Sequence, residues 1–211
     1  RTIIHSMSQI VPNSNLVKTT RKSLLSQSTN LEQRFIPNYK ELAKIVQTFK
    51  EMGYRVVLTQ GVYDLIHEGH AAYLETAKAQ GDILIVGVDS DELTRKRKGP
   101  ERPIVPQEER LKMLGHLRHV DVVTLRNVTD DIGDLIRLVK PDVLVVSKST
   151  TDFSRKMANE YVDFCGKIVT LPPQATTTTS ARIRNLTIEG AEKLAKKVSE
   201  LTQEFLIDIR K

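Results

Sequence analysis

The chain has 211 residues, a length that fits one compact domain with terminal extensions and leaves too little room for two full domains. Its hydrophobic content of 39% suffices for a core, and the aromatic content of 5%, without tryptophan, indicates aliphatic packing of the kind found in parallel sheets. The single cysteine excludes an intramolecular disulfide, and the net charge of +6 favours anionic partners.

Residues 1–33 are rich in Ser, Thr, Asn and Lys and contain only isolated aliphatic side chains. This composition buries too little apolar surface to offset the entropy lost on ordering, so we expect a flexible or loosely docked extension. The sequence has no apolar run near the roughly 20 residues that span a bilayer, and this segment lacks the apolar stretch of a secretory signal. With a single cysteine, these features lead us to expect a cytoplasmic protein.

Helical and strand patterns alternate from residue 39 onward. Apolar residues recur at helical spacing over residues 42–49 and predict a helix that ends at Gly53. A β-branched run at residues 55–59 predicts the first buried strand, and a helix over residues 71–78 follows it. The same alternation predicts further strands at residues 83–88, 120–125, 143–146 and 168–171, and helices at residues 107–117, 130–139 and 153–164.

Strands that alternate with helices favour a parallel sheet with helices on both faces. Five such strands predict an α/β fold, a doubly wound, Rossmann-like sheet in a domain of residues 34–187. In this architecture ligands bind at the carboxyl ends of the strands, near the switch in strand order. We therefore expect the functional residues in the loops that follow the strands.

Residues 188–211 carry apolar side chains at helical spacing, which predicts a C-terminal helix with one apolar face. Because exposure of such a face to water is unfavourable, we expect the helix to pack on the core or on a second subunit. The second possibility is the basis for expecting a homodimer.

Two histidines follow the first predicted strand, next to the start of a helix. Gly61 ends the strand, and His67 and His70 lie three positions apart with Gly69 between them. Imidazoles at this spacing share one face of a helix N-terminus, where backbone N–H groups attract phosphate and Gly69 allows it to approach closely. The alternative is a pair of ordinary surface histidines, but the position after a strand and a glycine favours anion binding.

The segment of residues 61–70 reads Gly-Val-Tyr-Asp-Leu-Ile-His-Glu-Gly-His. It resembles the signature of the cytidylyltransferase-like nucleotidyltransferases, Gly-x-Phe-Asp-x-x-His-x-Gly-His, with tyrosine in place of the usual phenylalanine. The resemblance extends over about residues 39–186. It implies that His67 and His70 are catalytic and donate hydrogen bonds to the α-phosphate of a nucleotide. It also implies nucleotide contacts from Gly61, Val62, Tyr63, Asp64 and Gly69.

Basic residues concentrate after the second predicted strand, in residues 91–103, where we expect a polar loop. The pairs Lys98-Gly99 and Arg102-Pro103 resemble the basic loop of the same family, especially that of the bacterial heptose-1-phosphate adenylyltransferases. The resemblance implies a catalytic Lys98 that bridges donor and acceptor phosphates, and a phosphate contact from Arg102. A solvated basic loop is the alternative. Because the excess charge is local rather than spread along a track, nucleic acid is not an expected partner.

Pro106 and Arg110 resemble the Pro-x-x-x-Arg helix start of this family. The resemblance implies that Arg110 helps to organise the phosphate and acceptor site. Alternatively, Arg110 pairs with Glu108 or Glu109 on the surface, and the sequence favours neither interpretation.

A run of hydroxyl side chains follows the fifth predicted strand. Thr178, Thr179 and Ser180 stand in register with the Ser-Thr-Ser/Thr-x-x-Ile motif of the family, which implies contacts with the triphosphate. Arg182 replaces an aliphatic residue of that motif and is a candidate for another phosphate contact. Capping of the following helix is the alternative role for the hydroxyls.

The loop after the fourth predicted strand departs from the family pattern. Relatives of the heptose type carry Lys-Gly-Gly-Asp-Tyr there, whereas this chain has Ser-Lys-Ser-Thr at residues 147–150. Lys148 is the candidate to replace the cation of that loop. The departure leaves two interpretations, an enzyme with a different acceptor or a nucleotide-binding protein with lost or altered turnover.

Together these features predict transfer of AMP or CMP from ATP or CTP to a phosphorylated acceptor, either a sugar phosphate or a polyol or amino-alcohol phosphate, with release of pyrophosphate. In-line transfer of this kind depends on alignment and charge stabilisation. We expect Mg²⁺ to bind mainly through the triphosphate, without a metal site made of side chains. A fragment of a class I aminoacyl-tRNA synthetase would share the histidine motif, but the chain has no room for a tRNA-reading domain.

Overall fold

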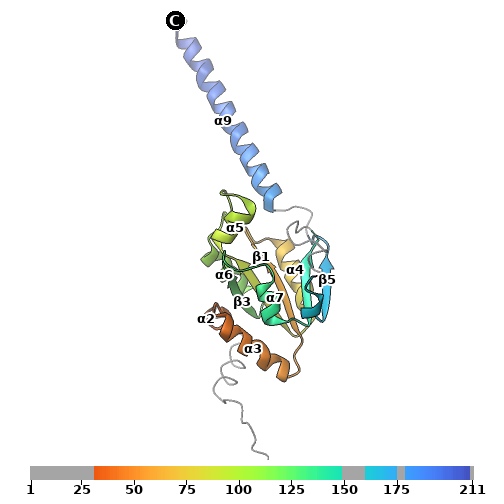
Figure 1. Ribbon diagram of the computed structural model, residues 1–211. Helices are drawn as coiled ribbons and strands as arrows, with labels where there is room; N and C mark the ends of the chain where they lie inside the picture. Colours follow the sequence, from red (N-terminus) through yellow and green to blue (C-terminus); the bar gives the residue numbers. More distant parts are fainter. Residues whose placement is uncertain (1–30, 149–159, 175–178, 210–211) are drawn as a thin grey trace, which may run out of the picture.

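A five-stranded parallel sheet organises the protein (Figure 1). The computed structural model describes residues 31–148, 160–174 and 179–209. The strand order β3-β2-β1-β4-β5 shows that the chain builds the sheet outward from β1 in one direction, then crosses over and builds it in the other. The prediction of a doubly wound, Rossmann-like sheet is therefore confirmed. The strands are β1 (Val56–Gly61), β2 (Ile83–Asp89), β3 (Val122–Arg126), β4 (Val143–Ser147) and β5 (Lys167–Leu171).

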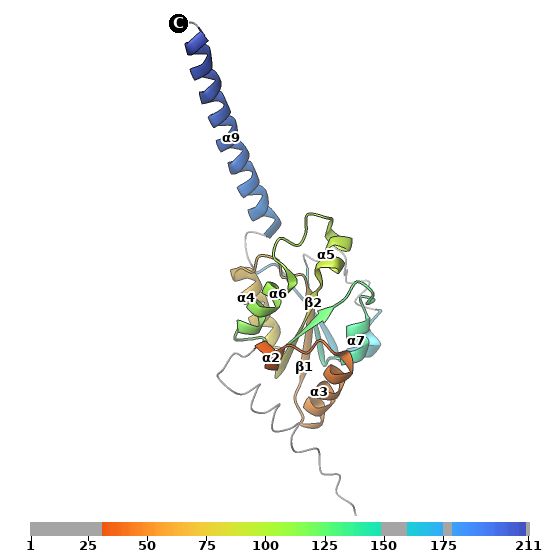
Figure 2. The same ribbon diagram turned by 90° about the vertical axis from the view of Figure 1, so that its left-hand side faces the viewer.

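Helices cover both faces of this sheet (Figure 2). The helices are α2 (Leu31–Arg34), α3 (Tyr39–Glu51), α4 (Glu68–Lys78), α5 (Asp91–Lys98), α6 (Gln107–His116), α7 (Asp134–Val139) and α9 (Thr179–Ile209), with a 3-10 turn η1 (Val162–Phe164). Apolar side chains of α3 and α7 share one core cluster with Leu58 of β1, and those of α4 and α6 share a second with Val57. Because successive strand residues point to opposite faces, the two clusters fill the two sides of the sheet.

The basic segment after β2 is a helix, so the prediction of a loop there was wrong. The side chain of Ser90 caps α5 by accepting a hydrogen bond of 3.1 Å from the backbone N–H of Leu93. Asp91 and Glu92 lie in the first turn and four basic residues in the last, an arrangement that complements the helix dipole. These end effects stabilise a helix that has almost no apolar face.

Two other predicted helices differ from the structure. The helix expected at residues 130–139 begins only at Asp134, because residues 127–133 form turns in which Asp130 and Asp134 accept hydrogen bonds from nearby backbone N–H groups. The helix expected at residues 153–164 falls mostly on residues 149–159, which lie outside the described part of the chain. Only the short turn η1 is seen at its end.

The C-terminal helix is longer than expected and begins at Thr179 rather than near Ile188. It projects from the end of the sheet domain (Figure 1). Its apolar side chains are exposed, with Leu194 at 66% and Phe205 at 64%. The expectation that this helix packs on the core was therefore wrong, and the expectation of a second subunit stays a prediction.

The N-terminal extension is described only from residue 31, so the prediction of flexibility falls mainly on residues outside the described part. Arg34 is buried, and its guanidinium donates to the carbonyl of Val120 at 2.8 Å. Arg34 thus fastens α2 to the sheet domain. Within the described ranges, no helix combines the length and apolar character needed to cross a bilayer.

Candidate active site

Three helices begin at one edge of the sheet. The chain leaves the carboxyl end of β1 for α4, that of β2 for α5, and that of β5 for α9. Because the strands are parallel, these three helix starts lie at the same edge. The predicted catalytic histidines, the basic segment and the first turn of α9 are thereby brought to one side of the molecule.

The two histidines lie side by side at the start of α4, with their ring planes tilted by 48° to each other. Their ring centroids are 4.2 Å apart. His67 is the N-cap residue, and its Nδ1 accepts a hydrogen bond of 3.1 Å from the backbone N–H of Gly69. The Nδ1 of His70 accepts a longer hydrogen bond of 3.4 Å from the backbone N–H of His67. The pair is thus a capping box built from two imidazoles.

This capping arrangement defines the chemistry that the histidines present. Since each Nδ1 accepts a hydrogen bond, a neutral ring carries its proton on Nε2. Burial lowers the pKa of His70 from 6.5 to about 4, with further contributions from His67 and Lys98. At neutral pH His70 therefore offers a neutral Nε2–H donor.

The low pKa of His70 predicts a loss of stability in acid. As the pH falls through 6.5, the unfolded chain binds a proton at this residue, whereas the folded ring stays neutral until about pH 4. The stability present above pH 6.5 should therefore decline between pH 6.5 and 4, by about 2 kcal/mol after allowance for the partly exposed ring. Urea unfolding of the wild type and His70→Gln over this range should show a shallower decline in the variant. The exposed His116→Gln is the control, and equal slopes for wild type and His70→Gln would contradict the prediction.

Asp64 and Arg102 bind each other, while their expected contacts with nucleotide and phosphate stay predictions. Asp64 is 4% exposed, and Arg102 forms an ion pair with it at 3.0 Å. The Asp64 carboxylate also accepts hydrogen bonds from the backbone N–H groups of Ile104, at 3.0 Å, and Val105, at 2.9 Å. Asp64 therefore anchors the loop between α5 and α6 against the loop that carries the histidines.

Arg110 is a buried positioning residue, so the alternative of a surface pair with Glu108 or Glu109 was wrong, while its role at the phosphate and acceptor site stays a prediction. It is 1% exposed. Its guanidinium donates to the carbonyls of Val62, Val105 and Asp89, the last two at 2.9 Å, and to the carboxylate of Asp91 at 2.6 Å. One side chain thus ties the ends of β1 and β2 to the starts of α5 and α6.

Asp89 forms a second buried charge cluster, which the sequence did not single out. Its carboxylate is fully buried and accepts hydrogen bonds from Arg126, at 2.7 Å, and from Arg97 of α5. Asp89 and Arg126 are paired residues in the register of β2 and β3. In the sequence, an acidic residue directly follows one predicted strand and a basic residue directly follows the next. Placing these two strands side by side in parallel would have suggested this ion pair. The cluster fastens the last turns of α5 to the sheet.

The remaining predicted residues have different surroundings. Lys98 ends α5 and Lys148 follows β4, and both are exposed. Val62 and Tyr63 are buried, at 7% and 5% exposure, so a nucleotide would meet their backbone rather than their side chains. Gly61, at the end of β1, is partly exposed.

The hydroxyl motif is described only in part. Thr178 and the side chains of Thr179, Ser180 and Arg182 lie outside the described part of the chain. The backbone nevertheless places residues 179–182 in the first turn of α9. The predicted contacts of these side chains stay predictions.

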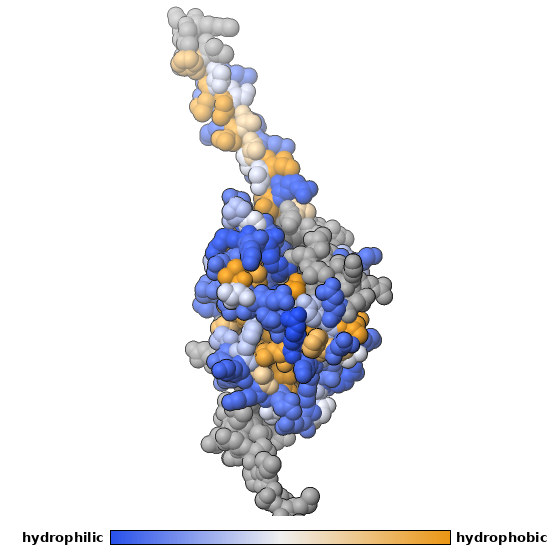
Figure 3. Space-filling view, in the orientation of Figure 1, coloured by the Kyte–Doolittle hydropathy of each residue, from blue (hydrophilic) through white to orange (hydrophobic). Residues whose placement is uncertain are grey.

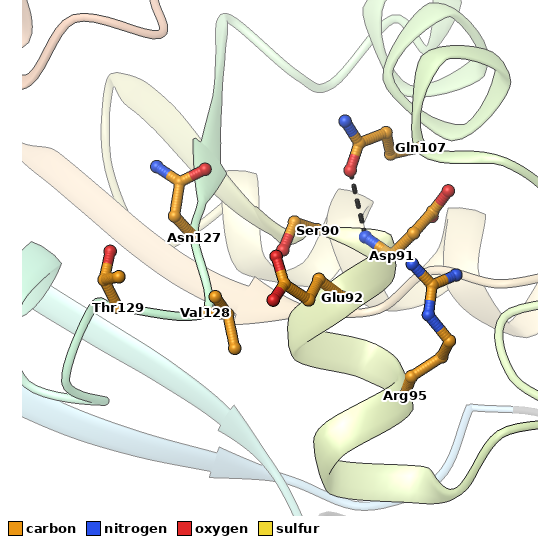
Figure 4. Close-up of a pocket in the computed structure, with 8 residues that line it drawn as sticks. All are labelled: Ser90, Asp91, Glu92, Arg95, Gln107, Asn127, Val128 and Thr129. Carbon is orange, nitrogen blue, oxygen red and sulfur yellow. Dashed lines mark hydrogen bonds between the residues drawn. The ribbon is translucent and has the colours of Figure 1, made fainter.

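A polar hollow of about 490 Å³ lies beside α5, at the carboxyl ends of β2 and β3 (Figure 4). Its lining includes the side chains of Asp91, Glu92, Arg95, Gln107 and Asn127. The backbone N–H of Asp91 donates to Gln107 at 2.9 Å. Carboxylate, amide and guanidinium groups of this kind suit a ligand with several hydroxyl groups.

Comparison with known proteins identifies relatives of this chain. The model of the cytidylyltransferase-like family matches residues 58–186. "Bifunctional protein HldE" of Desulfatibacillum aliphaticivorans is 37% identical over 144 residues, which cover 68% of this chain and 29% of that protein. The protein of the same name from Methylobacillus flagellatus is 33% identical over 165 residues, 78% of this chain and 34% of that protein. The chain thus spans about a third of the length of these relatives.

A solved structure supports the fold. Pantoate-beta-alanine ligase from Francisella tularensis superimposes with a TM-score of 0.54 at 17% sequence identity, over 77% of each chain. At this identity the similarity concerns the fold alone.

Proposed function

The chain belongs to the cytidylyltransferase-like family, and we propose that it is a nucleotidyltransferase that transfers AMP or CMP from ATP or CTP to a phosphorylated acceptor and releases pyrophosphate. The observation that carries this proposal is the histidine pair at the start of α4, whose Nδ1 atoms are both used by the helix cap. A neutral ring whose Nδ1 is used in this way carries its proton on Nε2, the atom that we propose as the donor to phosphate. The pairs Lys98-Gly99 and Arg102-Pro103 favour ATP over CTP, because they resemble the basic loop of the bacterial heptose-1-phosphate adenylyltransferases.

Catalysis in this proposal depends on charge stabilisation. An oxygen of the acceptor phosphate attacks the α-phosphorus in line with the bond to pyrophosphate, which then breaks. His67 and His70 donate from Nε2 to the oxygens of the α-phosphate, where negative charge redistributes in the transition state. A neutral His70, with a pKa of about 4, acts there as a hydrogen-bond donor rather than as a general acid. Arg110 and Asp64 act indirectly, because they hold the loops that carry these groups.

Lys98 is the proposed bridge between the donor and acceptor phosphates. It is exposed at the end of α5, and its charge contributes to the low pKa of His70. We expect Lys98→Ala to lower the rate constant at saturating substrate by about 10²–10³-fold, because a cation that follows the shifting charge is lost. Lys96→Ala, an exposed lysine of the same helix, should leave the rate nearly unchanged. A normal rate for Lys98→Ala in pyrophosphate release would assign the role to another group.

The hollow beside α5 is the proposed binding place for the acceptor. It lies next to the helix that ends in Lys98, and its carboxylate and amide side chains suit the hydroxyls of a sugar or polyol phosphate. Lys148, after β4, and Arg182, in α9, remain candidates for contacts with the phosphates.

We expect Mg²⁺ to be bound by the nucleotide rather than by the protein. Among the described residues, no group of three or more His, Cys, Asp and Glu side chains is arranged to hold a metal ion. These side chains therefore offer no cage for Mg²⁺, which binds triphosphate oxygens and water readily. The role of Mg²⁺ stays a prediction, and dependence of turnover on added Mg²⁺ would test it.

Pyrophosphate release tests the proposed function. ATP and CTP should each be assayed with a panel of sugar-1-phosphates, glycerol phosphate and phosphoethanolamine, and one pair should support turnover well above the others. The alternative is a nucleotide-binding protein without turnover, which the altered loop at residues 147–150 favours. Binding of ATP or CTP without pyrophosphate release for any acceptor would support that alternative and overturn the proposed enzyme.

A further inference from the structure

Helix α9 carries an apolar face that the described part of the chain leaves uncovered. Leu194, Val198, Leu201 and Phe205 are between 53% and 66% exposed. Figure 3 shows hydrophobic atoms along one side of the projecting helix. Together with Ala191, these residues recur at alternating intervals of three and four, the spacing of positions a and d in a heptad repeat. We call this set the α9 seam, and such a seam is buried by packing against another helix.

We propose that the α9 seam binds the α9 seam of a second copy of this chain, with the two helices antiparallel. With Ala191 at position a, the flanking g positions are Lys197 and Glu204. In an antiparallel pair g positions face each other, so Lys197 of each copy meets Glu204 of the other, and two ion pairs form by symmetry. In a parallel pair g faces e, where Lys197 would meet Thr202. The charges therefore match only the antiparallel orientation.

The other flank and the layers of the seam agree with this orientation. Positions e are the small residues Ala195 and Thr202, and the Thr202 hydroxyl already donates to the carbonyl of Val198 at 2.8 Å. This side of α9 can therefore pack against a second helix without burying a charged side chain that lacks a partner. In the antiparallel pair Val198 lies level with Leu201 of the second copy, and Leu194 lies level with Phe205, so each of these layers joins a smaller apolar side chain to a larger one.

The position of the seam leaves room for two sheet domains. The seam begins at Ala191, whereas residues 179–190, next to the domain, lack it. Since α9 projects from the domain (Figure 1), antiparallel pairing places the two domains at opposite ends of the helix pair. A membrane surface fits less well, because the polar face of residues 188–205 carries four acids and three lysines rather than the basic excess that anionic lipids attract.

The mass of the full 211-residue chain in solution tests the association. Sedimentation at micromolar concentrations with a reductant should show a dimer. Leu201→Glu, which places a charge in the middle of the seam, should raise the dissociation constant at least about 100-fold. Gln203→Glu adds the same charge at an exposed position away from the seam and should leave the dimer unchanged. A wild-type protein that stays monomeric, or a Leu201→Glu variant with the dissociation constant of the wild type, would overturn the proposal.

Charge reversal tests the orientation. Lys197→Glu places like charges at both g–g contacts and should weaken the dimer by about tenfold. The double variant Lys197→Glu/Glu204→Lys should recover the wild-type affinity, while Lys193→Glu, at an outward position of the heptad, is the control. Equal affinities for Lys197→Glu and Lys193→Glu would reject the antiparallel pair. Binding of a monomeric wild type to phosphatidylserine vesicles, lost in Leu201→Glu, would assign the seam to a membrane and reject the dimer.

Discussion

His70→Ala is expected to lower the rate of pyrophosphate release by about 10³-fold, equivalent to about 4 kcal/mol of transition-state stabilisation. The variant loses the neutral Nε2–H donor that the cap of α4 orients. The fold should survive, because the ring is only partly buried and its hydrogen bond to His67 is long, at 3.4 Å. Steady-state rates with the best nucleotide and acceptor pair, together with circular dichroism, would measure both effects.

Two further variants separate the donor role of His70 from other roles. His70→Gln can place an amide N–H near the position of Nε2 and should recover part of the lost rate, as a neutral donor would. His116→Ala removes an exposed histidine at the end of α6 and should leave the rate unchanged. An undiminished rate in His70→Ala would remove the histidine pair from the mechanism.

Asp89→Ala is expected to have the largest effect on stability, a loss of about 3–5 kcal/mol in the free energy of unfolding. Removal of this carboxylate leaves Arg126, whose side chain is 3% exposed, as a buried charge without its ion pair. It also removes the ion pair of Asp89 with Arg97, which weakens the docking of the last turns of α5 on the sheet. Urea denaturation at neutral pH would measure the loss.

Asp131→Ala is the matched control for Asp89→Ala. Asp131 forms an ion pair with Arg137 at 3.3 Å, but both side chains are well exposed. Its loss should cost less than about 1 kcal/mol, because water screens the pair. Equal losses in the two variants would contradict the structural importance of the buried cluster.

The strand and helix pattern was predictable because it depends on neighbours in the chain. Buried parallel strands require short apolar runs, and α3 requires apolar residues at helical spacing, so both leave a local signal. The histidine motif is also local, since a strand, a glycine and a helix start occupy adjacent segments. Helix α5 was missed because a helix without an apolar face leaves no periodic signal, and its end charges and the docking of Arg97 stabilise it instead.

The roles of Arg110 and Asp64 could not be decided from neighbours. Arg110 was weighed against adjacent glutamates, but its partners include Val62 and Asp89, far away in the chain. Asp64 was assigned to the nucleotide, but its carboxylate binds a loop 40 residues away at Ile104. A buried charged side chain must be paired or hydrogen-bonded, and its partner can come from a distant part of the chain, which the neighbouring sequence does not specify.

The sequence by itself determined the α/β alternation, the edge of the sheet where the candidate site lies, and the histidines at the start of a helix, because periodicity and parallel topology are sufficient for these. Only the tertiary structure decided which charged residues face solvent and which are buried in ion pairs and hydrogen bonds that hold the loops and helices together. It also decided that α9 projects with its apolar face uncovered, since burial depends on what the folded chain places around a side chain.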